Sequence, residues 1–475
     1  MSSPAFLPFF LGASLLTASL TCRTWSSPSS SASPPGFSQF QLLYLGAYLC
    51  MVAGDWMQGP YVYALYDAYG FSQRDIAVLF VAGFGSSMVL GPIAGSLADK
   101  YGRKKFALLY VAAYVCSCLT KHVNSYWVLM LGRLLGGVST SLLFSVFDSW
   151  MINEHNARGF DPSLLSGTFT KAVFANSVVA IASGLAANAA AAGAPLAPLA
   201  GGAWTSDDGK LMVGGATAPF DVAVLVLLCG GAAVANCWGE NYGARSDDKG
   251  GEAGNLDAIK CGVQAVLRDE KILLTGLVTS LFEGSMYAFV FMWTPALKES
   301  AGAEELPFGL IFATFMVCCM AGSQTFGILT GFMEIREVAT WTFALATASL
   351  AVPALTANPT GVFLAFLVFE FTVGLYFPAM GTLKSAIVPE KMRSTVYNIY
   401  RVPLNVIVLG VLLTSMSVSS TFFCCAAMLA AACFLQRRLS ALIEADENKA
   451  KRTGVDSGAA DPAQERQAML ANAEP

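Results

Sequence analysis

Twelve apolar stretches, each about as long as a helix that crosses a bilayer, occupy most of this 475-residue chain. Because apolar residues do not alternate with polar ones, the stretches predict helices rather than the strands of a barrel. Only 13% of the residues are charged, against roughly 25% in soluble domains. The sequence therefore predicts an all-α polytopic membrane protein, with spans at about residues 40–66, 75–98, 104–121, 125–152, 166–190, 218–238, 271–297, 306–330, 337–357, 360–386, 394–416 and 419–438.

The twelve spans form two sets of six, which we expect to be an amino-terminal bundle at 40–238 and a carboxy-terminal bundle at 271–440. A polar linker of mixed charge separates them at 239–270, and the tail at 441–475 is predicted to be frayed helix or disorder. Within the first span, Gly59-Pro60 predicts a kink or a local unwinding.

An additional apolar segment at residues 5–20 precedes the spans, within an amino-terminal region at 1–39. Arg23 and a Ser/Pro-rich linker at 24–36 follow it. No basic residue precedes the segment, so it is a poor secretory signal and predicts an extra helix. A cleaved signal and a plastid transit peptide remain the alternatives.

The turn between the second and third spans has the sequence GSLADKYGRKK at residues 95–105. Its cations favour the cytoplasmic side of a membrane. With this turn inside, alternate loops place 20 Lys and Arg residues inside and 4 outside, with 4 more within spans. This bias predicts a cytoplasmic carboxyl terminus, and an amino terminus outside if residues 5–20 are retained.

The same turn resembles the loop after the second transmembrane helix of major facilitator superfamily transporters. The matching residues are Gly95, Asp99, Gly102, Arg103 and Lys104, and Asp148 resembles the acidic partner that bonds Arg103 or a neighbour. The resemblance implies a cytoplasmic gate at this turn. It also implies two helical bundles, each built from three-helix repeats, with a substrate site between them near the membrane midplane.

Ionisable side chains inside membrane spans cost on the order of 3 kcal/mol, so they usually have a function. Eight lie within the predicted spans: Asp55, Arg133, Asp148, Lys171, Glu283, Glu370, Lys384 and Arg401. By the superfamily resemblance, the helices that carry them line or flank the central cavity.

The cations predict a site for an anion, since a guanidinium binds an oxyanion in a fork and an ammonium acts as a point charge. Arg133, Lys171, Arg401 and Lys384 are the candidate substrate ligands. Asp55, Glu283 and Glu370 are the candidates for charge balance or for carrying a co-transported proton. Two alternatives remain: the ions pair with each other and bind nothing, or Lys384 and Arg401 extend to the membrane surface.

Longer segments resemble the molybdate-anion transporter family over about residues 1–440. They are DWMQGPYVYALY (55–66), GRLLGG (132–137), SLLFS (141–145), WGENY (238–242), LFE (281–283), FVFMWTP (289–295), GLYFP (374–378) and YRVPL (400–404). The resemblance implies import of molybdate across the plasma membrane. The cations of the sequence do not distinguish molybdate from sulfate, because both are tetrahedral dianions.

Other functional classes have weaker support in the sequence. The 12 cysteines lie mostly in apolar spans without metal-ligand spacing, and no nucleophile–base pair, phosphate loop or basic nucleic-acid patch occurs. We therefore expect no enzyme activity, no cofactor, no metal site and no nucleic-acid partner. The alternatives are a transporter of another solute, such as sulfate, a sugar or a drug, and a membrane receptor or scaffold that does not transport.

Overall fold

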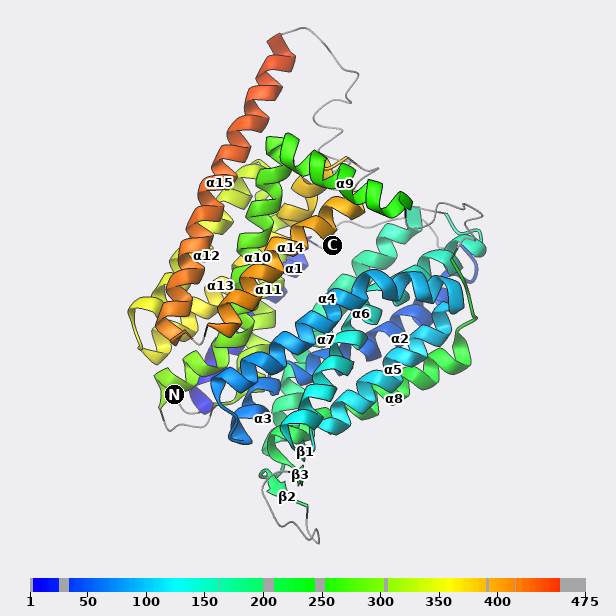
Figure 1. Ribbon diagram of the computed structural model, residues 1–475, viewed down its shortest axis with the longest axis vertical. Coiled ribbons are helices and arrows are strands. Elements are labelled where there is room, and N and C mark those ends of the chain that lie inside the picture. Colours follow the sequence, from blue (N-terminus) through cyan, green and yellow to red (C-terminus); the bar gives the residue numbers. More distant parts are fainter. Residues whose placement is uncertain are drawn as a thin grey trace. The chain divides into compact units, whose positions relative to one another are not determined.

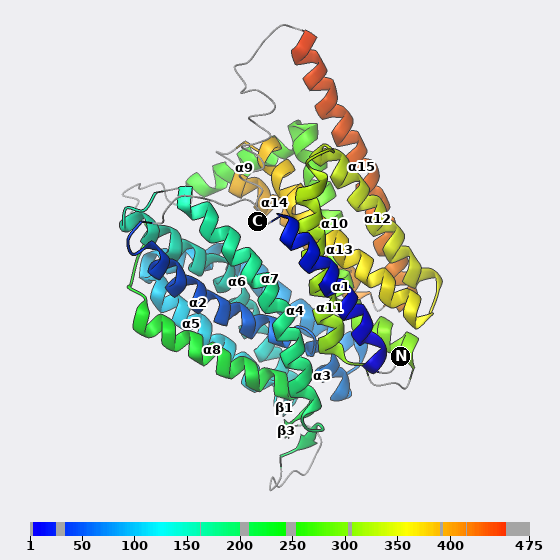
Figure 2. The ribbon, with the colours of Figure 1, turned by 180° about the vertical axis from the view of Figure 1, so that it is seen from behind.

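The computed structural model describes residues 3–24, 34–161, 163–199, 209–243, 253–302, 306–389, 393–414 and 416–452 (Figures 1 and 2). Helices account for most of these residues, as the predicted all-α fold requires. Ten helical segments of the described chain are long and apolar enough to cross a membrane. Two shorter apolar segments, at Phe6–Cys22 and Ile399–Leu413, accompany them.

Two compact units divide the described chain. The amino-terminal unit comprises residues of Pro28–Ser246 and Pro307–Ala313. The carboxy-terminal unit comprises residues of Met1–Ser27, Asp247–Leu306 and Thr314–Glu474.

The amino-terminal unit is a bundle in which α6 packs along α4 and α5, while α2 packs along α7 and α8. Small residues allow the closest approach: a Cβ atom added to Gly137 on α6 would lie 2.3 Å from the carbonyl oxygen of Gly83 on α4. The helices are α2 (Phe37–Gln58), α3 (Val62–Ala68), α4 (Gln73–Tyr101), α5 (Arg103–Thr120), α6 (Tyr126–Ala157), α7 (Ser163–Ala192) and α8 (Ala218–Cys237).

The first predicted span is interrupted at Gly59-Pro60. Helix α2 ends at Gln58, a turn follows, and α3 begins at Val62. Proline has no backbone N–H and its ring collides with the preceding turn of a helix. The interruption directs Tyr66 of α3 into the interior of the unit, where its side chain is fully buried.

The carboxy-terminal unit packs α15 along α10 and α12, and α13 along α12. Two glycines bring α11 and α13 together: a Cβ atom on Gly374 would lie 1.9 Å from the carbonyl oxygen of Cys319. The helices are α1 (Ser3–Thr24), α9 (Ala253–Arg268), α10 (Glu270–Ala301), α11 (Phe308–Leu329, from Thr314 onward in this unit), α12 (Ile335–Leu355), α13 (Pro359–Ile387), α14 (Arg393–Leu413) and α15 (Val418–Arg452).

The predicted extra helix is α1 (Figure 2). It belongs to the carboxy-terminal unit, although the residues that follow it in the chain belong to the amino-terminal unit. The ring of Phe6 is buried against Phe363 of α13, with 4.9 Å between ring centroids. The hydroxyl of Thr17 donates a hydrogen bond to the carbonyl oxygen of Val317 on α11, at 3.2 Å. These contacts cover one side of α11 and α13.

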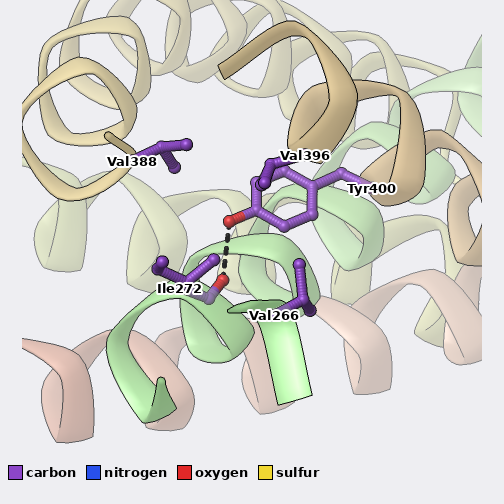
Figure 3. Packing of buried hydrophobic residues seen from close by; sticks show 5 residues of the cluster. All are labelled: Val266, Ile272, Val388, Val396 and Tyr400. Atoms are coloured by element: carbon purple, nitrogen blue, oxygen red, sulfur yellow. Dashed lines mark hydrogen bonds between the residues drawn. The ribbon is translucent and has the colours of Figure 1, made fainter. Parts of the chain in front are cut away.

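Part of the linker is the helix α9, whose end is buried in a small hydrophobic cluster (Figure 3). The hydroxyl of Tyr400 donates a hydrogen bond to the carbonyl oxygen of Ile272, at 2.6 Å, across this cluster. The cluster therefore attaches the linker to α10 and α14. Its buried members are Val266, Ile272, Val388, Val396 and Tyr400.

Three short strands form a small antiparallel sheet in the loops of the amino-terminal unit, in the order β1-β3-β2. Strand β1 (Val123–Asn124) and strand β2 (Ala197–Pro198) both pair with β3 (Lys210–Val213). The 3₁₀ helix η1 (Gly215–Thr217) follows β3. Strands as short as these carry no periodic signal that a sequence analysis could detect.

Helix α15 continues to Arg452, beyond the predicted end of the last span near residue 438. Two ion pairs hold the extension: Lys271 with Asp446 at 2.8 Å, and Arg336 with Glu447 at 3.0 Å. Residues 441–452 are thus helical, where the sequence favoured frayed helix or disorder. The tail after 452, most of the Ser/Pro linker and linker residues 244–252 lie outside the described residues.

Candidate functional site

The eight charged residues predicted to lie inside spans are all carried by helices of the two units. The amino-terminal unit carries Asp55 on α2, Arg133 and Asp148 on α6, and Lys171 on α7. The carboxy-terminal unit carries Glu283 on α10, Glu370 and Lys384 on α13, and Arg401 on α14.

Arg133 on α6 points toward α4. Its Nε atom donates a hydrogen bond to the carbonyl oxygen of Leu79, at 3.2 Å, and its guanidinium carbon lies 4.7 Å from the ring centroid of Phe80. Gly83 provides the space, because a Cβ atom there would lie 2.6 Å from Nη2 of Arg133. Among the described residues Arg133 forms no ion pair, so most of its donors remain available to an anion.

Asp55 on α2 is bound by a tyrosine rather than by an arginine. The hydroxyl of Tyr114 on α5 donates a hydrogen bond to Asp55 Oδ1. Arg133 is close enough to interact electrostatically with this carboxylate. The structure therefore brings Asp55 and Arg133 into one electrostatic neighbourhood without direct contact.

Lys171 on α7 is exposed, and it reaches α2 through a residue that the sequence analysis did not single out. Its ammonium group donates a hydrogen bond to Gln41 Oε1 at 2.7 Å. The amide nitrogen of Gln41 donates in turn to the hydroxyl of Thr168, at 2.9 Å. Gln41 thus links Lys171 to α2, and nothing in the described chain joins Lys171 to Arg133.

Glu283 on α10 is the centre of the charged group in the carboxy-terminal unit. The hydroxyl of Tyr376 on α13 donates a hydrogen bond to Glu283 Oε1 at 2.9 Å. The ammonium nitrogen of Lys384 lies 3.9 Å from the same oxygen and 5.5 Å from the ring centroid of Tyr397. Glu283 and Lys384 therefore partly neutralise each other, as in the alternative that the buried ions pair among themselves.

Arg401 and Glu370 are the remaining charged candidates of this unit. The side chain of Arg401 is exposed, and Tyr287 of α10 interacts electrostatically with both Arg401 and Glu283. Glu370 is 7% exposed and lies close to Cys318 and Cys319 of α11. Within the described residues, neither Arg401 nor Glu370 contacts Lys384 or Glu283 directly.

The basic turn between α4 and α5 is built around Gly102, whose φ of +115° suits glycine far better than other residues. Arg103 donates to Asp99 Oδ1 at 2.8 Å and to the carbonyl oxygen of Ser149 at 3.0 Å. Gly95 lies about one helical turn before Asp99, on the face of α4 toward α6, where an added Cβ atom would lie 3.9 Å from Cβ of Ser145.

The expected bond between Asp148 and Arg103 is not formed. Asp148 instead accepts a hydrogen bond from the hydroxyl of Tyr44 on α2, at 2.9 Å. Asp148 and Ser149 point in different directions from α6, so the carbonyl group of Ser149 meets the arginine and the carboxylate of Asp148 meets α2. This corrects the partner of Asp148 that the superfamily resemblance implied.

The segment after α8 binds the basic turn, a role that the sequence analysis missed. Glu240 accepts hydrogen bonds from the backbone N–H groups of Lys104 and Lys105, at 2.8 and 3.3 Å. A carboxylate at this position accepts hydrogen bonds from the otherwise unpaired N–H groups in the first turn of α5, and its negative charge interacts favourably with the positive end of the helix dipole. Asn241 completes the contact, since its backbone oxygen accepts from the N–H of Arg103 at 3.0 Å. The family-like segment WGENY contained this signal, but sequence alone does not show which turn its carboxylate meets.

No group of three His, Cys, Asp or Glu side chains in the described ranges could hold a metal ion. Arg133 within the amino-terminal unit and Lys384 within the carboxy-terminal unit each offer cationic donors to an anion.

Comparison with known proteins identifies the family. Residues 5–376 match a family described as sugar transporters with 12 transmembrane segments. The molybdate-anion transporter of Xenopus tropicalis is 36% identical over 396 residues, covering 81% of each chain. Those of Takifugu rubripes and Danio rerio are 34% and 33% identical, with 85% of each chain covered.

Solved structures share the fold at low sequence identity. The nucleoside transporter NupG has a TM-score of 0.60 at 11% identity, covering 84% of this chain and 98% of its own. A bacterial homologue of the human lysosomal transporter Spinster has a TM-score of 0.62 at 13% identity, covering 86% and 98%. These structures share the fold of this chain, and the family match and the relatives show that the chain belongs to the molybdate-anion transporter family of the major facilitator superfamily.

Proposed function

We propose that this transporter imports molybdate, a tetrahedral oxyanion, across the plasma membrane by alternating access. The observation that carries the proposal is the kinship itself: relatives named molybdate-anion transporter are 33–36% identical to this chain over most of their length.

The charges of the two units support an anionic substrate. Arg133 has donors free for an oxyanion, and Lys171, Arg401 and Lys384 supply further positive charge along the proposed route. Binding a dianion beside a guanidinium replaces lost hydration with charge-assisted hydrogen bonds. Asp55, Glu283 and Glu370 would balance the cations when the site is empty, or carry a proton together with the substrate.

Alternating access fits a chain made of two bundles of six spans, at 40–238 and 271–440, joined by a linker at 239–270. The basic turn would be a cytoplasmic gate formed by Gly95, Asp99, Gly102, Arg103 and Lys104. The carboxyl terminus would be cytoplasmic and the amino terminus outside.

The test is molybdate accumulation in cells that otherwise lack its uptake, with and without this protein at the cell surface. We expect accumulation that depends on the protein and saturates with molybdate. Equal accumulation in both cell lines would overturn the proposal and favour a receptor or scaffold.

A competition experiment separates molybdate from other solutes. The family description as sugar transporters makes sugars a second candidate class, and sulfate is the closest anionic analogue. A large excess of hexose should leave molybdate uptake unchanged, and excess sulfate should inhibit it weakly. Uptake of labelled hexose but not of molybdate would replace the proposal with a sugar transporter.

A further inference from the structure

Lys121 lies in the turn between α5 and α6, at the end of the amino-terminal unit opposite the Gly102 turn. Its side chain is only 1% exposed. Its ammonium nitrogen is buried and has no hydrogen-bond partner among the residues that the structure describes. A buried, unpaired ammonium group is costly, so such a group normally binds an anion or loses its proton.

A second unsatisfied donor lies beside it. Tyr66 of α3 is fully buried, and its hydroxyl oxygen lies near the guanidinium of Arg133, while no acceptor of the described chain takes the hydroxyl hydrogen. The ammonium nitrogen of Lys121 lies 5.7 Å from the centroid of the Tyr66 ring. Two unsatisfied buried donors side by side are unusual, because nearly all buried polar groups in proteins have partners.

Arg133 adds a second positive charge to this place. It is close enough to interact electrostatically with both Lys121 and Tyr66. Two cations in one buried neighbourhood repel each other, and that repulsion is relieved when an anion lies between them.

No carboxylate of the described chain neutralises Lys121. The acidic groups that act on the neighbouring Cys118 have other partners: Asp221 pairs with His122 at 3.0 Å, and Asp55 accepts the hydroxyl hydrogen bond of Tyr114. An internal ion pair therefore does not explain the burial of this lysine.

Local packing holds the lysine in place against α6. The hydroxyl of Tyr69 donates to the carbonyl oxygen of Lys121 at 2.6 Å, which fixes the backbone. At Gly132 on α6, an added Cβ atom would lie 2.9 Å from the ammonium nitrogen and 1.9 Å from the hydroxyl oxygen of Thr120. Glycine at 132 thus lets the ammonium group lie against α6, near Arg133.

We propose that Lys121, Tyr66 and Arg133 form a binding site for a small inorganic oxyanion within the amino-terminal unit. An ammonium, a hydroxyl and a guanidinium together match the acceptor oxygens of a tetrahedral dianion. Burial favours a free ion over a lipid headgroup, which carries acyl chains. The site rests on the proposed function only for the identity of the ion, molybdate, and at the end opposite the basic turn it would receive the anion from outside.

The test is equilibrium binding of molybdate and of sulfate to the purified full-length protein in detergent, with Lys121→Met and Tyr66→Phe as variants. Methionine keeps the length and burial of the side chain but removes its charge. The matched control is Arg74→Met, which removes an exposed cation from the first turn of α4 at the same end of the unit.

We expect Lys121→Met to weaken molybdate binding about tenfold or more, Tyr66→Phe to weaken it several-fold, and Arg74→Met to leave it unchanged. The thermal stability of Lys121→Met without anion should equal or exceed that of the wild type, which shows that the variant folds. Unchanged molybdate and sulfate affinity in Lys121→Met would overturn the site, even if the wild type transports molybdate. Sulfate binding that depends on Lys121, in a protein that does not take up molybdate, would support the site and reject the proposed substrate.

Discussion

Lys384 and Glu283 form an ion pair within the carboxy-terminal unit, with 3.9 Å between the ammonium nitrogen and a carboxylate oxygen. The hydrogen bond from Tyr376 holds the carboxylate at 2.9 Å and leaves the lysine as its weaker partner. An entering anion could therefore compete with Glu283 for Lys384. Arg133 in the amino-terminal unit has no such competitor at contact distance.

The substitution Glu283→Gln tests this competition. Without the carboxylate, Lys384 should bind the anion more tightly and release it more slowly. We expect KM for molybdate to fall a few-fold, in line with about 1 kcal/mol for a partly exposed pair, and the maximal rate to fall as well. Uptake kinetics measure both. Glu299→Gln, on the exposed last turns of the same helix, is the control, and unchanged KM and rate in Glu283→Gln would contradict the assignment.

Replacing Arg133 separates its charge from its geometry. Arg133→Ala should abolish molybdate uptake, and Arg133→Lys should reduce it by about tenfold or more because a lysine keeps the charge but loses the planar fork. Surface labelling of the intact cell should show normal amounts of both variants in the membrane. Normal uptake by either one would remove Arg133 from the substrate site.

The turn at Gly102 should tolerate no larger residue. In Gly102→Ala, the new Cβ atom would lie 2.6 Å from the carboxylate carbon of Glu240, at a φ of +115°. We expect a loss of about 1–3 kcal/mol of stability, measured as a lower melting temperature of the purified protein. Gly85→Ala on α4 is the control, because nothing lies within 4 Å of its added Cβ atom. Equal melting temperatures for the two variants would show that Glu240 does not restrict this turn.

Much of the fold follows from the sequence because span length and loop charge are local properties. The first span and its interruption at Gly59-Pro60 are of this kind, as is the helix at residues 3–24. The packing of that helix on α11 and α13 is not, since an apolar helix carries no signal that selects its neighbours.

The charged residues of the site could be predicted from the sequence, but the residues that bind them could not. A hydropathy analysis identifies Arg133 and Glu283 because charged residues are rare within an apolar span. The tyrosine partners, Tyr114 for Asp55 and Tyr376 for Glu283, lie far away in the chain, and tyrosine is common in apolar helices. The sequence analysis did not single out Lys121, because a lysine at the end of a span is expected to be in water. Only the structure shows that its side chain is buried.

The pH dependence of anion binding depends on the protonation of Lys121. Burial, and secondarily the charge of Arg133, lower the pKa of Lys121 from 10.5 to about 7. The groups that face it are Arg133 from α6, Cys118 from α5 and Tyr66 from α3, and of these Arg133 carries the full charge. Near neutral pH the lysine therefore changes between an ammonium, which attracts an anion, and an amine, which does not.

Because the pKa is lowered, the charged form is lost as pH rises through about 7, and anion affinity should fall with it. We expect the apparent Kd for molybdate to rise toward tenfold per pH unit above pH 7. Titrations of the purified protein at pH 6.5, 7.5 and 8.5, repeated with sulfate, measure this. In Lys121→Met the dependence should flatten, whereas in Arg74→Met it should persist. Affinity that rises with pH, or a slope that survives in Lys121→Met, would show that another group controls binding.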